Sequence, residues 1–127
     1  MTPTAKVVSL LKQNSDKLVG ISPEHVHAFM IKPSDWSKKD CIIRVSELPA
    51  GQHEYGNTVP INEKKAVQVE FYYPVDYQQD MDLIEKSVKS FLFAHKIRCY
   101  SDAGHVITPD NGNIENTLKF NYIEEDI

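Results

Sequence analysis

The segment AVQVEFYY, residues Ala66–Tyr73, constrains the fold more than any other stretch of the chain. Successive side chains of an extended backbone point to opposite sides, so this segment has one apolar face and one mixed face. The apolar face consists of Val67, Val69, Phe71 and Tyr73. The mixed face consists of Ala66, Gln68, Glu70 and Tyr72. The pattern predicts a β-strand that ends at Pro74 and belongs to a sheet with one covered face.

Two segments have the helical period that could supply this cover. The first helix is predicted over Thr2–Asn14, with the threonine as N-cap and a proline in the first turn. The second helix is predicted to begin after Asp80 or Asp76, and we expect Glu85 and Lys89 to form an ion pair one turn apart on its surface. Its apolar face consists of Met81, Ile84, Val88, Phe91 and Leu92.

The remaining strands are predicted from short apolar or alternating runs between turn residues. They are His25–Ile31, Cys41–Leu48, Lys96–Ser101 and Asn116–Ile123, with one further short strand in the turn-rich stretch Asp102–Asn113 and an acidic tail at Glu124–Asp126. The element order favours one α+β domain over residues 1–127. We expect a mainly antiparallel sheet of about four to five strands, with two amphipathic helices packed on one face.

The polar segment Pro49–Lys65 has no periodicity and is predicted to lack regular structure. Loops longer than about 12–15 residues are uncommon in compact domains and are usually functional or disordered. We therefore expect this segment to serve a function outside the core or to be disordered.

Composition narrows the possible partners. The formal net charge is -4, which argues against a nucleic-acid binder held by a general basic field. No apolar run is long enough to span a bilayer, and no secretory leader pattern opens the chain, so we expect an intracellular product without membrane contact. Cys41 and Cys99 lie in strand-like runs and are expected to be free, buried thiols.

The histidines offer the first candidates for chemistry. His25 and His27 lie two residues apart and could share a metal, but no third ligand accompanies them, so surface or edge histidines are the better interpretation. His105 follows Gly104 and could act as a base only if a partner residue lies beside it.

The carboxylates add no local signature of a catalytic site. Asp80, Asp82 and Glu85 are expected to cap the second helix and to complement its dipole. No glycine-rich phosphate loop is present. We therefore predict no catalytic, cofactor-binding or metal-binding residues, and a protein that is not an enzyme.

Interface residues are a better prospect. Trp36 lies in a polar turn, where it is either an interface residue or a lid on the core. His53, Glu54 and Tyr55 lie in the polar segment and fit a solvated loop tip or a protein contact. Tyr72 points away from the apolar face, where it is either ordinary surface or a contact anchor.

A set of short motifs in the second half of the chain resembles one protein family. The motifs are Pro60–Glu63, YYP at Tyr72–Pro74, DM at Asp80–Met81 with the helix after it, AGH at Ala103–His105, TPD at Thr108–Asp110 and LKF at Leu118–Phe120. Their order and spacing resemble those of the siphophage tail terminator or tail-completion proteins. This family of minor tail components occurs in phages of lactic-acid bacteria and has been known as a domain of unknown function.

The resemblance implies a structural role in the virion. Such a protein forms a ring, usually a hexamer, on the completed tail tube, stops tube polymerisation and provides the surface for head attachment. The implied partners are other copies of the chain, the tail-tube protein and the head–tail connector protein, and DNA passes through the ring without specific binding. The implied location is the tail end next to the head, with the host cytoplasm as the site of assembly.

Other roles stay open at this point. A head–tail joining protein of the same virion would also be small, ring-forming and non-enzymatic. A small-molecule-binding regulatory α+β domain would use the open sheet face, with His25, His27 and Tyr72 lining its site. An RNA-binding sheet is disfavoured, because Glu70 stands where such a domain needs a basic side chain.

Overall fold

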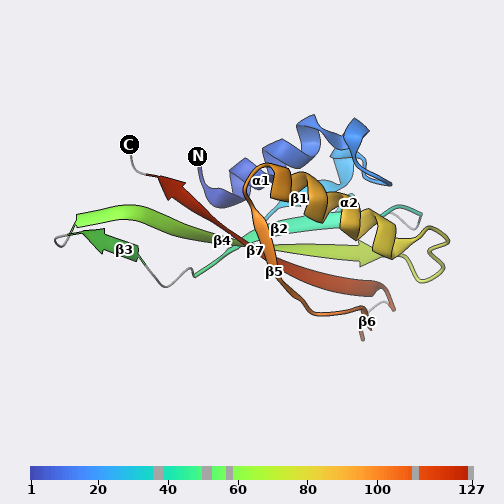
Figure 1. Cartoon of the computed structure of the whole chain (residues 1–127). Helices are drawn as coiled ribbons and strands as arrows, with labels where there is room; N and C mark the ends of the chain where they lie inside the picture. Colours follow the sequence, from blue (N-terminus) through green and yellow to red (C-terminus); the bar gives the residue numbers. More distant parts are fainter. Residues whose placement is uncertain (36–38, 50–52, 57–58, 110–111, 126–127) are drawn as a thin grey trace.

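The computed structural model describes residues 1–35, 39–49, 53–56, 59–109 and 112–125, with backbone alone for 53–56, 59–63 and 125. The predicted α+β class is confirmed, since two α-helices lie with strands of one mixed sheet (Figure 1). The elements are α1 (Pro3–Gln13), the 3-10 turns η1 (Ser15–Lys17) and η2 (Pro23–His25), β1 (Val26–Ala28), β2 (Ile42–Leu48), β3 (His53–Gly56), β4 (Val59–Tyr73), α2 (Met81–Ala94), β5 (Arg98–Asp102), β6 (Val106–Ile107) and β7 (Ile114–Glu125).

The sheet is mainly antiparallel, as predicted. Its main path runs β1–β2–β4–β7–β5, while the short strands β3 and β6 pair with β4 and β7. Among the described strands, only β1 and β2 are parallel. Both helices lie on the same side of the sheet (Figure 1).

The core lies between this sheet face and the helices. The alternation in β4 is confirmed, because all four residues of the apolar face are fully buried. They pack in one cluster with Val7 and Leu11 of α1, and with Ile84, Val88 and Leu92 of α2. Local capping also follows the sequence: the Thr2 side chain accepts a hydrogen bond from Ala5 N (3.1 Å), and Asp80 accepts one from Leu83 N (3.2 Å).

The prediction that Pro49–Lys65 lacks regular structure is wrong for the described residues. β3 pairs antiparallel with the first part of β4, from His53 opposite Glu63 to Gly56 opposite Val59. We call β3 and the part of β4 before Ala66 the arm. Figure 1 shows it projecting beyond the helix-covered body, with no helix over it. A strand without a covered face needs no apolar–polar alternation, so periodicity could not reveal it.

The ends of two other strands also differ from the prediction. The first strand is only Val26–Ala28, because a 3-10 turn precedes it and Phe29 takes a left-handed backbone conformation (φ +64°). β7 extends to Glu125, so part of the expected acidic tail pairs with the arm, with Glu125 opposite Asn62. Backbone pairing with a neighbouring strand thus continues where the apolar pattern stops.

Candidate functional site

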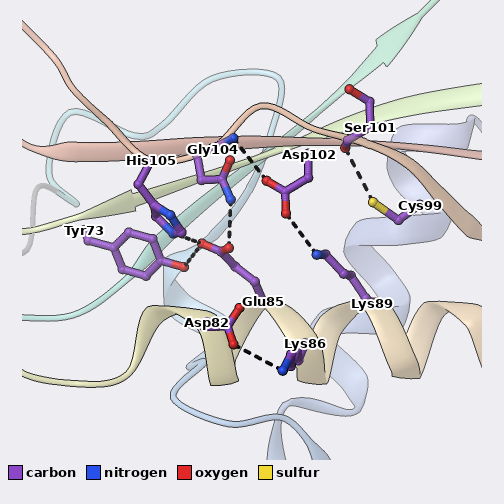
Figure 2. A network of polar contacts seen from close by, with 11 residues as sticks. Tyr73, Asp82, Glu85, Lys86, Lys89, Cys99, Ser101, Asp102, Gly104 and His105 are labelled. Atoms are coloured by element: carbon purple, nitrogen blue, oxygen red, sulfur yellow. Dashed lines mark hydrogen bonds and ion pairs between the residues drawn. The ribbon is translucent and has the colours of Figure 1, made fainter.

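The most concentrated polar group in the core surrounds Glu85, and we call it the Glu85 cluster (Figure 2). Glu85 projects from α2 toward the sheet and is only 2% exposed. Its Oε2 accepts hydrogen bonds from the Tyr73 hydroxyl of β4 (2.6 Å) and from His105 Nε2 (2.8 Å). Its Oε1 accepts one from Asn116 Nδ2 of β7 (2.7 Å). One carboxylate thus ties a helix to two strands and to the turn after β5.

The expected pair between Glu85 and Lys89 is therefore wrong. Lys89 instead donates to Asp102 Oδ2 at the end of β5 (3.0 Å), and Gly104 N donates to the other oxygen of that carboxylate (3.1 Å). Partial burial disfavours ionisation of Asp102, but hydrogen bonds from Lys89, Asn116 and Gly104 hold its pKa below the usual value. This second carboxylate fixes the turn that carries His105.

The expectation that Asp80, Asp82 and Glu85 all serve the helix N-terminus holds for two of them, since Asp80 is the N-cap and Asp82 lies in the first turn of α2. Asp82 also pairs with Lys86 on the exposed side of α2 (3.3 Å). Glu85 faces the core instead. The sequence signal is its spacing from Val88 and Leu92, three and seven residues away, which places a carboxylate on the apolar face.

The Glu85 cluster provides the partner that His105 would need as a base. The His105 side chain is 35% exposed, and no described residue hydrogen-bonds its other ring nitrogen. The Tyr73 hydroxyl and the Cys41 thiol near Glu85 stay protonated at physiological pH. Burial, the Cys41 thiol and Glu85 raise the pKa of Tyr73. Burial and the charges of Glu85 and Asp40 raise the pKa of Cys41. Cys41 is therefore no thiolate nucleophile. The arrangement joins α2 to the sheet and holds His105 in one orientation.

The two N-terminal histidines converge on one carboxylate. His25 Nδ1 lies 2.6 Å from Asp35 Oδ1, and His27 Nε2 hydrogen-bonds Asp35 Oδ2. His27 lies on β1, which ends the described strand order, so it is an edge-strand histidine as expected, but its ring is buried and not on the surface. No group of three or more His, Cys, Asp or Glu residues in the described part of the chain is arranged to hold a metal ion.

On the sheet face away from the helices, Tyr72 belongs to a polar group centred on Glu70. Arg44 Nη2 donates to both oxygens of Glu70 (2.5 and 2.6 Å), Gln68 donates to one of them (2.6 Å), and the Tyr72 hydroxyl donates to the other. Partial burial and the neighbouring Glu70 raise the pKa of Glu115 on the adjacent strand. Tyr72 is half-buried and already engaged within its own chain.

The predicted interface residues do not form one surface. Trp36 lies outside the described residues. His53, Glu54 and Tyr55 form β3 in the arm, where His53 is opposite Glu63. Tyr72 lies nine positions after Glu63 along β4, which corresponds to about 30 Å. The arm and the Tyr72 face are therefore separate candidate surfaces.

No protein-family model matches the chain, and no curated protein matches it either. In the described part of the chain, no helix is long and apolar enough to cross a membrane.

Proposed function

We propose that this protein is a structural phage morphogenesis protein that caps the completed tail tube as a ring. In this role it stops tube polymerisation and forms the surface on which the head attaches. The observation that carries the proposal is the arm, a β-element that leaves the helix-covered body. The motif resemblance in the second half of the chain supplies the specific assembly.

The energetics of the arm favour a role in contacts between molecules. β4 is 15 residues long, about 50 Å, but its residues in the core cluster begin only at Val67. β7 pairs with β4 from Asn62 onward, so only the tip of the arm, where Tyr55 and Gly56 pair with Pro60 and Val59, is a two-stranded hairpin. Such a hairpin is marginally stable in water and gains stability when another layer covers it or another strand pairs with it. A neighbouring subunit or the tail tube would supply that cover.

The open face of the sheet gives less support to a small-molecule site. The donors that such a site would use are engaged within the chain: His25 and His27 bind Asp35, and Tyr72 binds Glu70. A head–tail joining protein is the closer alternative, because it would use the same kind of ring contact. The net charge of -4 suits either ring, since an acidic lumen repels the phosphates of passing DNA.

The test is the solution mass by light scattering, with and without the tail-tube protein encoded in the same genome. A ring, or a capped tube that forms only with the tube protein, is the expected result. A monomer or dimer indifferent to tube protein contradicts the proposal. Binding to the head–tail connector protein alone, without any effect on the length of tail tubes, would favour the role of a head–tail joining protein.

Deletion of residues 51–57 tests the arm within this experiment. This deletion removes β3 and no described residue of the core cluster, so the free energy of unfolding of the body should change little. We expect the truncated protein to fold and to lose its binding to tubes or to other copies. Normal capping by the folded, truncated protein would show that the arm is not the contact element.

A further inference from the structure

A groove lies between the second half of α2 and the edge strand β5, and we call it the α2–β5 groove. It has a volume of about 600 Å³ and is lined by Lys89, Ser90, Phe93, Arg98, Cys99, Tyr100 and Asn121. A second hollow of about 430 Å³ shares Tyr100 and Asn121 with it and continues to Pro49, Lys64 and Ala66. The combined surface thus runs from α2 past β5 to the base of the arm, which suits an extended segment.

The chemistry of this surface is basic and aromatic. Phe93 and Tyr100 are 62% and 53% exposed, so the groove offers two large apolar side chains to a partner. The described lining includes three cations, Lys64, Lys89 and Arg98, and no carboxylate, although the whole chain has a net charge of -4. Of these cations, Lys89 pairs with Asp102 beside the groove. The surface therefore fits a segment that carries both apolar side chains and carboxylates.

The backbone of β5 adds a second means of recognition. Among the described strands, β5 pairs only with β7, so its outer edge has no strand partner. An extended segment can add to such an edge through main-chain hydrogen bonds while its alternate side chains enter adjacent pockets.

The outer part of the arm, residues 53–63, has the matching composition, while Lys64 and Lys65 lie at its base next to Ala66. Residues 53–63, HEYGNTVPINE, contain Glu54 and Glu63 and no lysine or arginine, together with Tyr55, Val59 and Ile61 as apolar side chains. β3 pairs only with β4 in the described residues, so it also has a free edge. The arm cannot fold back into its own groove, because β4 is held in register with β7 as far as Asn62 opposite Glu125.

We infer that the α2–β5 groove receives the arm of a second copy of this chain. Because arm and groove are different surfaces, each copy would bind one neighbour and be bound by another, and such a heterologous contact closes a ring when the rotation per subunit permits. The inference rests on the proposed function and names the contact that would build its ring.

Site-specific cross-linking between two variants tests the contact directly. One variant carries Tyr55→Cys in the arm and the other carries Ser90→Cys in the groove, both in a Cys99→Ser background, while the native Cys41 is buried. The two are mixed with a short bis-maleimide linker, with and without tail-tube protein. Since the cysteines are on different chains, a cross-linked dimer reports only contacts between copies. Lys12→Cys on the exposed side of α1 replaces Ser90→Cys in the control.

The expected result is a dimer from the Tyr55→Cys and Ser90→Cys pair, and none from the control pair. A charge reversal, Arg98→Glu, should reduce its yield about tenfold, in line with the loss of one interface hot spot. Rings on tubes without this cross-link would overturn the inference and leave the proposed function standing. The cross-link without any binding to tubes would support the inference and contradict the proposed function. If neither ring nor cross-link forms, the proposed function and the inferred contact are both wrong. Binding of a single-stranded oligonucleotide in the groove would then identify nucleic acid as the occupant of the groove.

Discussion

Replacement of Glu85 should lower the free energy of unfolding far more than replacement of an exposed carboxylate on the same helix. In Glu85→Ala, the Tyr73 hydroxyl and the Asn116 amide lose their acceptor in the core, at 2.6 and 2.7 Å in the native protein. Each stranded donor costs about 1–3 kcal/mol, so we expect a loss of about 4 kcal/mol in the free energy of unfolding. The contribution of His105 should be smaller, because water can reach its partly exposed ring.

The conservative variant refines this expectation. Glu85→Gln preserves the volume and one acceptor oxygen, and the Tyr73 hydroxyl can turn to accept from the new amide. With the amide NH2 in the Oε2 position, Asn116 Nδ2 keeps its acceptor, and the unfavourable donor–donor contact is with His105 Nε2 when that nitrogen carries a proton, so the expected loss is about 1–2 kcal/mol. Asp82→Asn on the exposed side of α2 is the matched control, with an expected change within about 0.5 kcal/mol.

Urea unfolding is the assay, and the midpoint should shift while the slope m stays constant. The reasoning is refuted if Glu85→Ala is no less stable than Asp82→Asn. It is also refuted if Glu85→Gln is more stable than the wild type, because the cost of removing the charge of Glu85 from water would then outweigh the hydrogen bonds that the carboxylate accepts.

Two further changes probe the rest of the fold. Partial burial and Glu70 raise the pKa of Glu115, so this carboxyl takes up a proton when the protein folds. The stability that Glu115 contributes therefore falls as pH rises from the ordinary carboxyl pKa through the raised pKa of the folded protein. Glu115→Gln should raise Tm by about 2 °C at pH 7 and should leave Tm unchanged below the ordinary carboxyl pKa. Calorimetry over a pH series checks this, and an equal gain at every pH would contradict it. Gly20 and Gly104 both have positive φ (+66° and +87°), but only at Gly20 would a Cβ meet a buried side chain, at 2.9 Å from Ile84 Cδ1. Gly104→Ala should cost about 1 kcal/mol of backbone strain and Gly20→Ala about 1–3 kcal/mol more, measured by urea unfolding; equal losses would mean that Ile84 moves aside freely.

The helix-covered body could be predicted from the sequence because its signals are local. The alternation of Val67, Val69 and Phe71 reports one covered face, and the caps at Thr2 and Asp80 depend only on residues three positions away. Each of these patterns is complete within one element, so no knowledge of the tertiary structure is required to recognise it.

The polar clusters could not be predicted in this way because their members are far apart in the chain. Glu85 meets Asn116 across 31 residues, and spacing along the helix favoured Lys89 instead. Similarly, Asp35 binds His25 and His27 only because the chain turns back after β1. The sequence marked Glu85 as unusual by its place on an apolar helix face, but only the register of β4 and β7 identifies its partners.

Only the second half of β4 could be predicted from the sequence, because the first half belongs to the arm. From Ala66 onward, β4 obeys a pattern because α1 and α2 cover one of its faces. Before Ala66 it has backbone partners on both sides, with His53 and Glu124 both opposite Glu63, yet no helix lies over it. Main-chain pairing specifies geometry but not which face is buried, so it leaves no period in the sequence. A segment of this kind contributes little to its own core, and its composition is free to suit a partner. The carboxylates and apolar residues in the outer part of the arm, residues 53–63, are therefore not required by the core of their own chain and are free to suit the partner that we propose.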